Sequence, residues 1–227
     1  MESDGPILYQ STRIETYRQI VSQLIEDGYA YPCACTRKDL PASGKYPGTC
    51  RNGITGNRQA RSVRFCVEGM QHRFTDKLQG LISGSANDNS GDFVIQRSDG
   101  LFAYQLAVVV DDNFQGITQV VRGADLLDST PRQIGLQHAL GYTTPDYVHL
   151  PLVLSDDGKK LAKRLKADPV RHKDPRVVIG HALQFLGQQP PTGLSLDKLW
   201  QWAIEHWDRN LVRACKANVP QPIWKSV

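Results

Sequence analysis

The chain of 227 residues carries a formal net charge of +4 and is 40% hydrophobic and 22% charged. That composition supports a hydrophobic core without disulfide bonds and excludes an intrinsically disordered chain. No apolar run approaches the roughly 18 residues of a membrane span, and the polar start MESDGPIL does not resemble a signal peptide. We therefore expect a cytoplasmic protein with no membrane partner. The mild positive charge permits a polyanionic partner without requiring one.

Hydrophobic spacing predicts the first elements. A helix is expected over Ser11–Asp27, because apolar residues recur at helical spacing before the stop signal Gly28. Residues 31–57 are rich in proline, glycine and cysteine and predict a loop-rich module that a core cannot hold by itself. Short strands are then expected at Ser62–Val67, Arg73–Asp76, Lys77–Ile82 and Asp92–Gln96.

The second half of the chain alternates strand-like and helix-like patterns. Leu101–Val110 is apolar, Gly116–Arg122 alternates in polarity, and Tyr147–Leu154 predicts a strand. Helices are expected at Thr130–Leu140, Pro175–Leu186 and Ser195–His206. This alternation favours an α/β fold with a partly parallel sheet.

Three of the five cysteines crowd into one short stretch, with Cys33 and Cys35 as a Cys-x-Cys pair and Cys50 after fourteen intervening residues. Three thiolates suit a soft, tetrahedral ion such as zinc, which would order a stretch that has few apolar residues. The fourth ligand is open between Tyr46, Cys66 and His72. Because a phenolate is a rare zinc ligand, chemistry alone favours Cys66 or His72. The alternative is three unrelated cysteines in a loop.

A basic loop, SDDGKKLAKR, spans Ser155–Arg164 and follows the strand-like LPLVL. Its cations are Lys159, Lys160, Lys163 and Arg164. Clustered cations after a strand suit the binding of a triphosphate or a nucleic-acid backbone. The alternative is a solvated basic loop, which composition alone favours.

The order of residues in this loop points to a family. KLAKR resembles the KMSKS signature of class I aminoacyl-tRNA synthetases. The run LFAYQLAVVVDDNFQGITQVVRGADLLDSTPRQIGLQHALGY, the strand PDYVHLPLVL and the cysteine segment YPCACTRKDL…YPGTCR resemble the glutamyl and glutaminyl branch of that class. Together they resemble the glutamyl-Q tRNA(Asp) synthetases, short paralogues of glutamyl-tRNA synthetase. The resemblance extends from about Tyr9 to about Gly187.

The resemblance implies a Rossmann-like class I catalytic domain that is N-terminally incomplete, with a zinc-containing insertion and a short C-terminal helical region. We expect a remnant of the first half of the nucleotide fold at residues 1–30, and the zinc-containing insertion with a small sheet at 31–91. The second half of the nucleotide fold, with the KLAKR loop, is expected at 92–170, and the helical region at 171–227.

The resemblance also implies residue roles. Tyr104 and Arg122 match the glutamate-binding positions, and an arginine there can form a two-pronged pair with a carboxylate. Lys160 and Lys163 match the ATP-binding positions, with Lys163 as the catalytic lysine. Four residues match the zinc ligands, and this set replaces the chemical preference for the fourth ligand: Cys33, Cys35, Tyr46 and Cys50.

In this family ATP, bound with magnesium, activates glutamate as glutamyl-adenylate, and glutamate then passes to the queuosine wobble base of tRNA(Asp). The expected cofactor is zinc, and the expected partners are ATP, glutamate and tRNA(Asp). About sixty residues follow KLAKR, which is too short for the large anticodon-binding region of a full glutamyl-tRNA synthetase.

Two departures from the family pattern stand out. The family opens with a strand, a His-Ile-Gly-His-like loop and an acidic residue, and none of these precedes Ser11; the signature also has Ala162 in place of serine. From these departures we expect little adenylate formation and self-association of this chain, and a monomer when the N-terminal segment is complete. The alternative functions are a non-catalytic, zinc-containing tRNA-binding synthetase remnant and a zinc-ordered interaction module.

Overall fold

The structure is a computed structural model that describes residues 3–85, 91–154, 160 and 173–214. The chain forms two compact units. The first unit comprises Met1–Phe74, Leu81–Val120 and Asp128–Asp146, and the second comprises Thr75–Gly80, Val121–Leu127 and Tyr147–Val227. The domain boundaries expected from the sequence stay a prediction.

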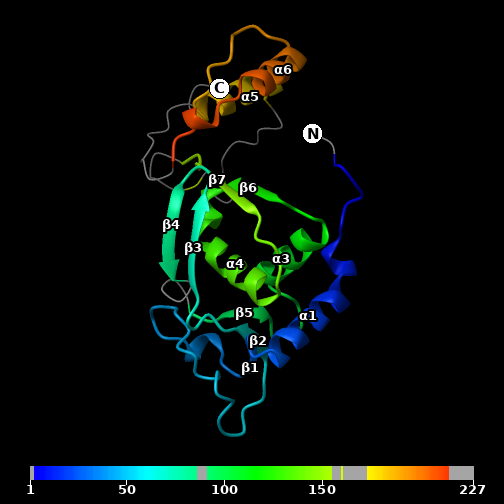
Figure 1. Ribbon diagram of the computed structural model, residues 1–227, viewed down its shortest axis with the longest axis vertical. Helices are drawn as coiled ribbons and strands as arrows, with labels where there is room; N and C mark the ends of the chain where they lie inside the picture. The colour runs from blue at the N-terminus through cyan, green and yellow to red at the C-terminus, as the bar shows by residue number, and fades with distance from the viewer. Residues whose placement is uncertain (1–2, 86–90, 155–159, 161–172, 215–227) are drawn as a thin grey trace. The chain divides into compact units, whose positions relative to one another are not determined.

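In the first unit, a three-stranded antiparallel sheet packs against a helix. The sheet has the order β1-β2-β5, with β1 at Ala30–Cys33, β2 at Ser62–Phe65 and β5 at Phe93–Gln96. Helix α1, Ile14–Glu26, contacts β1 (Figure 1). The expected strands at the β2 and β5 positions are confirmed. Strand β1 lies at the start of the segment that was predicted as loop-rich, and most of the rest of that segment is irregular.

Helix α1 confirms the predicted helix because its apolar residues form one buried stripe, with Tyr17, Val21 and Leu24 all at most 4% exposed. The helix begins three residues later than expected, since Gln10–Thr12 form a separate 3-10 turn. It ends where Gly28 adopts a positive φ of 77° and its amide donates to the carbonyl of Ile25. Only glycine adopts this backbone conformation without strain.

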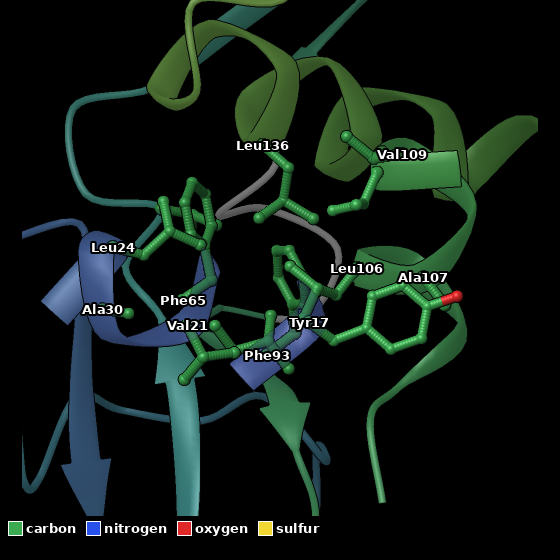
Figure 2. Packing of buried hydrophobic residues seen from close by; sticks show 13 residues of the cluster. Tyr17, Val21, Leu24, Ala30, Phe65, Phe93, Leu106, Ala107, Val109 and Leu136 are labelled. Atoms are coloured by element: carbon green, nitrogen blue, oxygen red, sulfur yellow. The ribbon is translucent and has the colours of Figure 1, made fainter. Parts of the chain in front are cut away.

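The core of the first unit lies between α1, the sheet and two further helices, α3 at Tyr104–Phe114 and α4 at Thr130–Ala139. Figure 2 shows side chains of α1, the sheet and α3 converging with Leu136 of α4. One buried carboxylate ties the helices together: Asp111 of α3 accepts hydrogen bonds from the Tyr17 hydroxyl at 2.5 Å and the Arg13 Nε at 2.9 Å. The predicted helix at 130–140 is confirmed.

A second sheet has the strand order β4-β3-β7-β6. Its strands are β3 at Gln71–Asp76, β4 at Gly80–Ser85, β6 at Gln119–Gly123 and β7 at Asp146–Leu150. Strands β3 and β7 pair in parallel, with Asp76 opposite Tyr147. The expected partly parallel sheet is therefore confirmed.

The strand expected at Lys77–Ile82 is wrong over its first three residues, which form a turn. The cause is Asp76, whose Oδ1 accepts hydrogen bonds from the amides of Leu78 at 2.9 Å and Gln79 at 2.8 Å. An aspartate side chain that binds the amides two and three residues ahead replaces the strand ladder with a turn. Strand β4 therefore begins only at Gly80.

The second unit ends in a helix pair, α5 at Pro175–Phe185 and α6 at Leu196–His206, which lie side by side (Figure 1). Both confirm predicted helices. The cap of α5 is Asp174, which accepts from the Arg176 amide at 2.9 Å, and the cap of α6 is Ser195. No helix among the described residues is long and apolar enough to cross a membrane.

Candidate active site and metal centre

The cysteine cluster of the first unit gathers at the end of β1. The Sγ atoms of Cys33, Cys35 and Cys50 all lie within 4.8 Å of one another, and those of Cys35 and Cys50 are 3.6 Å apart. All three side chains are buried. The two cysteines at the end of β1 and the one that follows fifteen residues later thus share one small volume, as the ligands of a single ion do.

Tyr46 completes the cluster. Its hydroxyl oxygen lies 3.3 Å from the Sγ of Cys33 and 3.6 Å from that of Cys35, and it accepts a hydrogen bond from the Cys50 amide at 3.0 Å. Gly91 allows this placement: its backbone pairs with that of Tyr46, and a Cβ there would lie 2.4 Å from the Tyr46 carbonyl oxygen. The loop can approach so closely only because residue 91 is glycine.

The geometry does not favour Cys66, one of the two ligands that chemistry alone preferred. Cys66 packs at the edge of the cluster, but among the described residues its sulfur does not join the three that lie together. The side chain of His72 lies outside the described part of the structure. The four donors brought together are the three thiols and the Tyr46 phenol, which match the number that a tetrahedral ion requires and of which the three thiols are soft.

A buried arginine adjoins this donor set. The Nε of Arg64 donates to the Sγ of Cys33 at 3.3 Å, and its guanidinium carbon lies 3.8 Å from the centre of the Tyr46 ring. Burial alone would raise the pKa of Cys33, but hydrogen bonds from Tyr46, the Cys35 amide and Arg64 lower it below its ordinary value. For Cys35, burial raises the pKa. One thiolate is therefore stabilised by the protein, and a divalent cation would stabilise the others.

A buried carboxylate braces the same region. Asp92, whose side chain is fully buried, accepts from the Val67 amide at 2.9 Å and from the Tyr31 hydroxyl, and it pairs with Arg51 at 2.9 Å. The carbonyl of Asp92 accepts from the Nη1 of Arg64 at 2.9 Å. The residue thus links Tyr31 of β1 to the arginine of β2 beside the cysteines. Sequence reasoning missed this bridging role of Asp92.

A cavity of about 550 Å³ opens next to the cysteine cluster. Cys35 and Arg64 are part of its wall, and its remaining charged side chains are three arginines and one aspartate: Arg37, Arg61, Arg97 and Asp99. Arg97 pairs with Asp99 at 2.6 Å. The lining therefore carries an excess of positive charge, which suits a polyanion.

The second unit holds Arg122, the expected glutamate-binding arginine, on β6. Its Nε donates to the Nε2 of His149 on β7 at 3.0 Å, and its guanidinium carbon lies 5.3 Å from the centre of the Tyr147 ring. The Nδ1 of His149 lies 2.6 Å from the Oδ2 of Asp76 at the end of β3. Sequence reasoning missed Asp76 and His149; the signal was a histidine inside YVHLPLVL, whose other residues are apolar.

Burial and hydrogen bonding set the charges of this pair. Burial of His149, with the neighbouring positive charge of Arg122, lowers its pKa, although Asp76 acts in the opposite direction. Burial alone would raise the pKa of Asp76, but hydrogen bonds from Gln79, His149 and Leu78 lower it. His149 is therefore neutral at physiological pH, and Asp76 is charged.

Of the other expected site residues, the structure describes Tyr104 and Lys160. Tyr104 begins α3 in the first unit and is 49% exposed. Lys160, in the second unit, donates to the Oδ2 of Asp125 at 2.5 Å, and this contact lowers the pKa of Asp125. Lys163 lies outside the described residues, as do Lys159 and Arg164.

Comparison with known proteins identifies the class of enzymes. The chain belongs to the class I tRNA synthetases of the E and Q type, whose catalytic-domain model matches residues 1–192. It is therefore a tRNA synthetase-type ligase with the α/β catalytic fold of that class. A solved glutamate-tRNA synthetase from Elizabethkingia anophelis aligns with 92% of this chain at a TM-score of 0.71 and 25% identity. The chain covers 52% of that longer protein.

Among the more similar relatives are proteins named glutamyl-Q tRNA(Asp) synthetase. The one from Dechloromonas aromatica is 47% identical over 218 residues, which make up 91% of this chain and 72% of the relative. The one from Pseudomonas aeruginosa is 44% identical over 224 residues, or 97% of this chain and 76% of the relative. The resemblance stated from the sequence is confirmed.

Proposed function

We propose that this chain activates glutamate with ATP and transfers it to the queuosine base of tRNA(Asp). The observation that carries this proposal is the sequence identity of 44–47%, over more than nine-tenths of the chain, with relatives named glutamyl-Q tRNA(Asp) synthetase. Those substrates are found in the cytoplasm, where we expect the protein to act.

Glutamate recognition rests on Arg122 and Tyr104. A guanidinium held by His149 can meet a carboxylate with two parallel hydrogen bonds, which fixes both the position and the orientation of the substrate. Tyr104, in the first unit, is exposed and offers a hydroxyl that can donate or accept a hydrogen bond. Without this role, Arg122 would be a half-buried structural cation and Tyr104 an ordinary surface aromatic.

Activation requires no nucleophile from the protein. The glutamate carboxylate attacks the α-phosphate of ATP, the bond to the pyrophosphate breaks, and pyrophosphate leaves with the electron pair. The protein aligns the reactants and neutralises phosphate charge. Lys160 and Lys163 supply that positive charge, and a magnesium ion bound with ATP would add to it.

The cysteine cluster is proposed to hold one zinc ion through Cys33, Cys35, Tyr46 and Cys50. Support comes from the four donor atoms that lie together and from the hydrogen bond that Arg64 gives Cys33. Zinc would serve as a crosslink that orders the irregular residues 34–61, because that stretch has few apolar side chains. The adjacent arginine-lined cavity is proposed to receive phosphates of the tRNA.

The test measures glutamate-dependent ATP–pyrophosphate exchange and then transfer of labelled glutamate to tRNA(Asp) with and without queuosine. The assay uses this chain and, beside it, the product of any in-frame upstream codons. We expect transfer only to the queuosine-containing tRNA. Binding of tRNA without exchange in either protein would favour a non-catalytic tRNA-binding role, and absence of both would favour an interaction module.

Arg122→Ala separates substrate recognition from folding. Removing one partner of a desolvated charge pair costs about 2–5 kcal/mol, which is roughly thirtyfold or more in glutamate affinity. The matched control is Arg18→Ala on the exposed face of α1, where the arginine pairs with Glu15. Unchanged glutamate affinity in Arg122→Ala would remove Arg122 from the site.

A further inference from the structure

Asp76 is surrounded by donors. Besides the amides of Leu78 and Gln79, its carboxylate accepts from the His149 amide at 3.1 Å and lies 2.6 Å from the His149 Nδ1. The side chains of Asp76 and His149 are both fully buried. A charged carboxylate can only accept hydrogen bonds, so the His149 Nδ1 beside it must be the donor. The proton of the neutral His149 therefore resides on Nδ1.

The other ring nitrogen then faces Arg122. With Nδ1 protonated, the Nε2 of His149 carries a lone pair, and it accepts the hydrogen bond that the Arg122 Nε donates at 3.0 Å. A side-chain amide strengthens the arrangement, since Gln79 donates from Nε2 to the His149 carbonyl at 2.6 Å. The His149 ring also stacks on Tyr147, with centroids 5.9 Å apart. The ring therefore has one defined orientation.

We propose that Asp76 and His149 form a buried relay whose task is to hold Arg122 in the orientation that receives the glutamate carboxylate. Both are positioning residues, and the inference rests on the proposed role of Arg122 in binding glutamate. The relay fixes the Nε edge of the Arg122 guanidinium and thereby orients its terminal nitrogens toward the position of the glutamate carboxylate. A long arginine side chain loses much conformational freedom on binding, so fixing it beforehand increases the affinity for the substrate.

A purely structural role for His149 makes a different prediction. If the histidine only fills the core beside β3 and β7, any substitution would act through stability, and glutamate and ATP binding would change together. The relay instead predicts a selective loss of glutamate affinity that depends on which ring nitrogen is replaced.

Two amide substitutions replace one ring nitrogen each. The carboxamide of His149→Asn lies where Nδ1 is, so it donates to Asp76 but falls short of Arg122. The carboxamide of His149→Gln lies where Nε2 is, so its oxygen still accepts from Arg122. We expect His149→Asn to weaken glutamate affinity about tenfold or more, with the KM for ATP within twofold of the parent. His149→Gln should retain most of the glutamate affinity at a similar loss of thermal stability.

Arg122→Lys provides the coupling control, since lysine has no Nε–H donor in that position. In this background His149→Asn should cause no further loss of glutamate affinity, because the contact is already gone. The relay is wrong if His149→Asn and His149→Gln lose glutamate affinity equally, or if neither loses it. If Arg122→Ala itself leaves glutamate binding unchanged, the proposed role of Arg122 fails instead.

A tautomer measurement tests the relay without any activity. Nitrogen-15 NMR of the neutral histidine rings distinguishes a protonated Nδ1 from a protonated Nε2. We expect the proton of His149 on Nδ1 in the parent. In Asp76→Asn, an amide NH2 group replaces Oδ2 and donates to Nδ1, so the ring proton should move to Nε2. There it would face the N–H of Arg122, donor against donor. A parent His149 with the proton on Nε2 would overturn the relay.

Discussion

Arg64 donates a hydrogen bond from Nε to the Sγ of Cys33 across 3.3 Å while a second guanidinium nitrogen, Nη1, donates to the carbonyl of Asp92 at 2.9 Å. The guanidinium is held between a strand end and a candidate metal ligand. Hydrogen bonds from such outer residues orient metal ligands and tune their basicity. Arg64 is therefore expected to contribute to metal affinity without touching the ion.

Arg64→Met should lower zinc affinity roughly 10- to 100-fold, because the Cys33 thiolate loses its charged donor while the buried volume is largely kept. Competition with a coloured chelator measures the change. Arg61→Met is the matched control, since Arg61 is an exposed arginine that lines the same cavity. Equal zinc affinity in the Arg64 variant and the parent would contradict a role for Arg64 in the metal site.

Purified protein should contain one zinc ion per chain, and Cys35→Ser should lose most of it. A serine hydroxyl is a harder and far less acidic donor than a thiol, so the tetrahedral set is left with three effective ligands. Elemental analysis measures the metal content. Cys66→Ser is the control that should keep its zinc, because Cys66 stands outside the sulfur group. Full retention of zinc in Cys35→Ser would refute the assignment.

Hydrophobic spacing predicts helices that bury one regular apolar stripe and strands whose residues alternate between buried and more exposed positions. Helix α1 and the α5–α6 pair belong to this group, and so does strand β5. The strand prediction from hydrophobic spacing is wrong where a side chain forms local hydrogen bonds. The carboxylate of Asp76 accepts from the amides that follow it, and the first residues of the predicted strand form a turn. The spacing also left Leu101–Val110 without an assignment, most of which lies in α3.

The candidate site was predictable only in part, for a physical reason. Ligand types and spacing point to Cys33 and Cys35, but the fourth donor depends on how the loop returns, which Gly91 decides through a contact 45 residues away from Tyr46 in sequence. Arg122 was found by family resemblance. Its partners Asp76 and His149 come from other strands, and only the pairing of β3 with β7 brings those two together.

Asp92→Asn should destabilise the fold by about 3 kcal/mol, because it removes the charge from a fully buried carboxylate that pairs with Arg51 and accepts from Tyr31. Urea unfolding followed by circular dichroism measures the free energy of unfolding. The control is Asp99→Asn, which weakens an exposed ion pair with Arg97 and should change stability much less. Equal effects of the two substitutions would show that Asp92 does not brace the cysteine region.

Arg37→Gln combined with Arg61→Gln should weaken tRNA binding and its salt dependence. Each lost phosphate contact makes the slope of log affinity against log salt shallower by about 0.7–0.9. The slope of the double variant should therefore be shallower by roughly 1.5. Filter binding at several salt concentrations measures the slope. Arg18→Gln, on α1 and away from the cavity lining, should leave it unchanged. An unaltered slope in the double variant would place the tRNA elsewhere.

Folding stability should fall as the pH drops below about 6.5, the ordinary pKa of histidine. Burial and the facing Arg122 lower the pKa of His149, and the facing Asp76 and Asp125 raise it by less. Over this pH range the histidine is therefore protonated in the unfolded chain but stays neutral in the folded chain. The unfolded state then binds more protons, and stability decreases from pH 6.5 down to the folded pKa. Asp76, whose pKa is also lowered, adds a second loss that begins near its ordinary value of 3.8.

Urea unfolding between pH 5 and 8 measures this dependence for the parent and for His149→Gln, whose side chain does not titrate. The other histidines and the carboxylates are the same in both proteins, so the difference between the two curves isolates His149. We expect the parent to lose more stability than the variant on acidification through pH 6. Parallel curves would mean that the buried histidine keeps its ordinary pKa, and that the Arg122 contact survives its protonation.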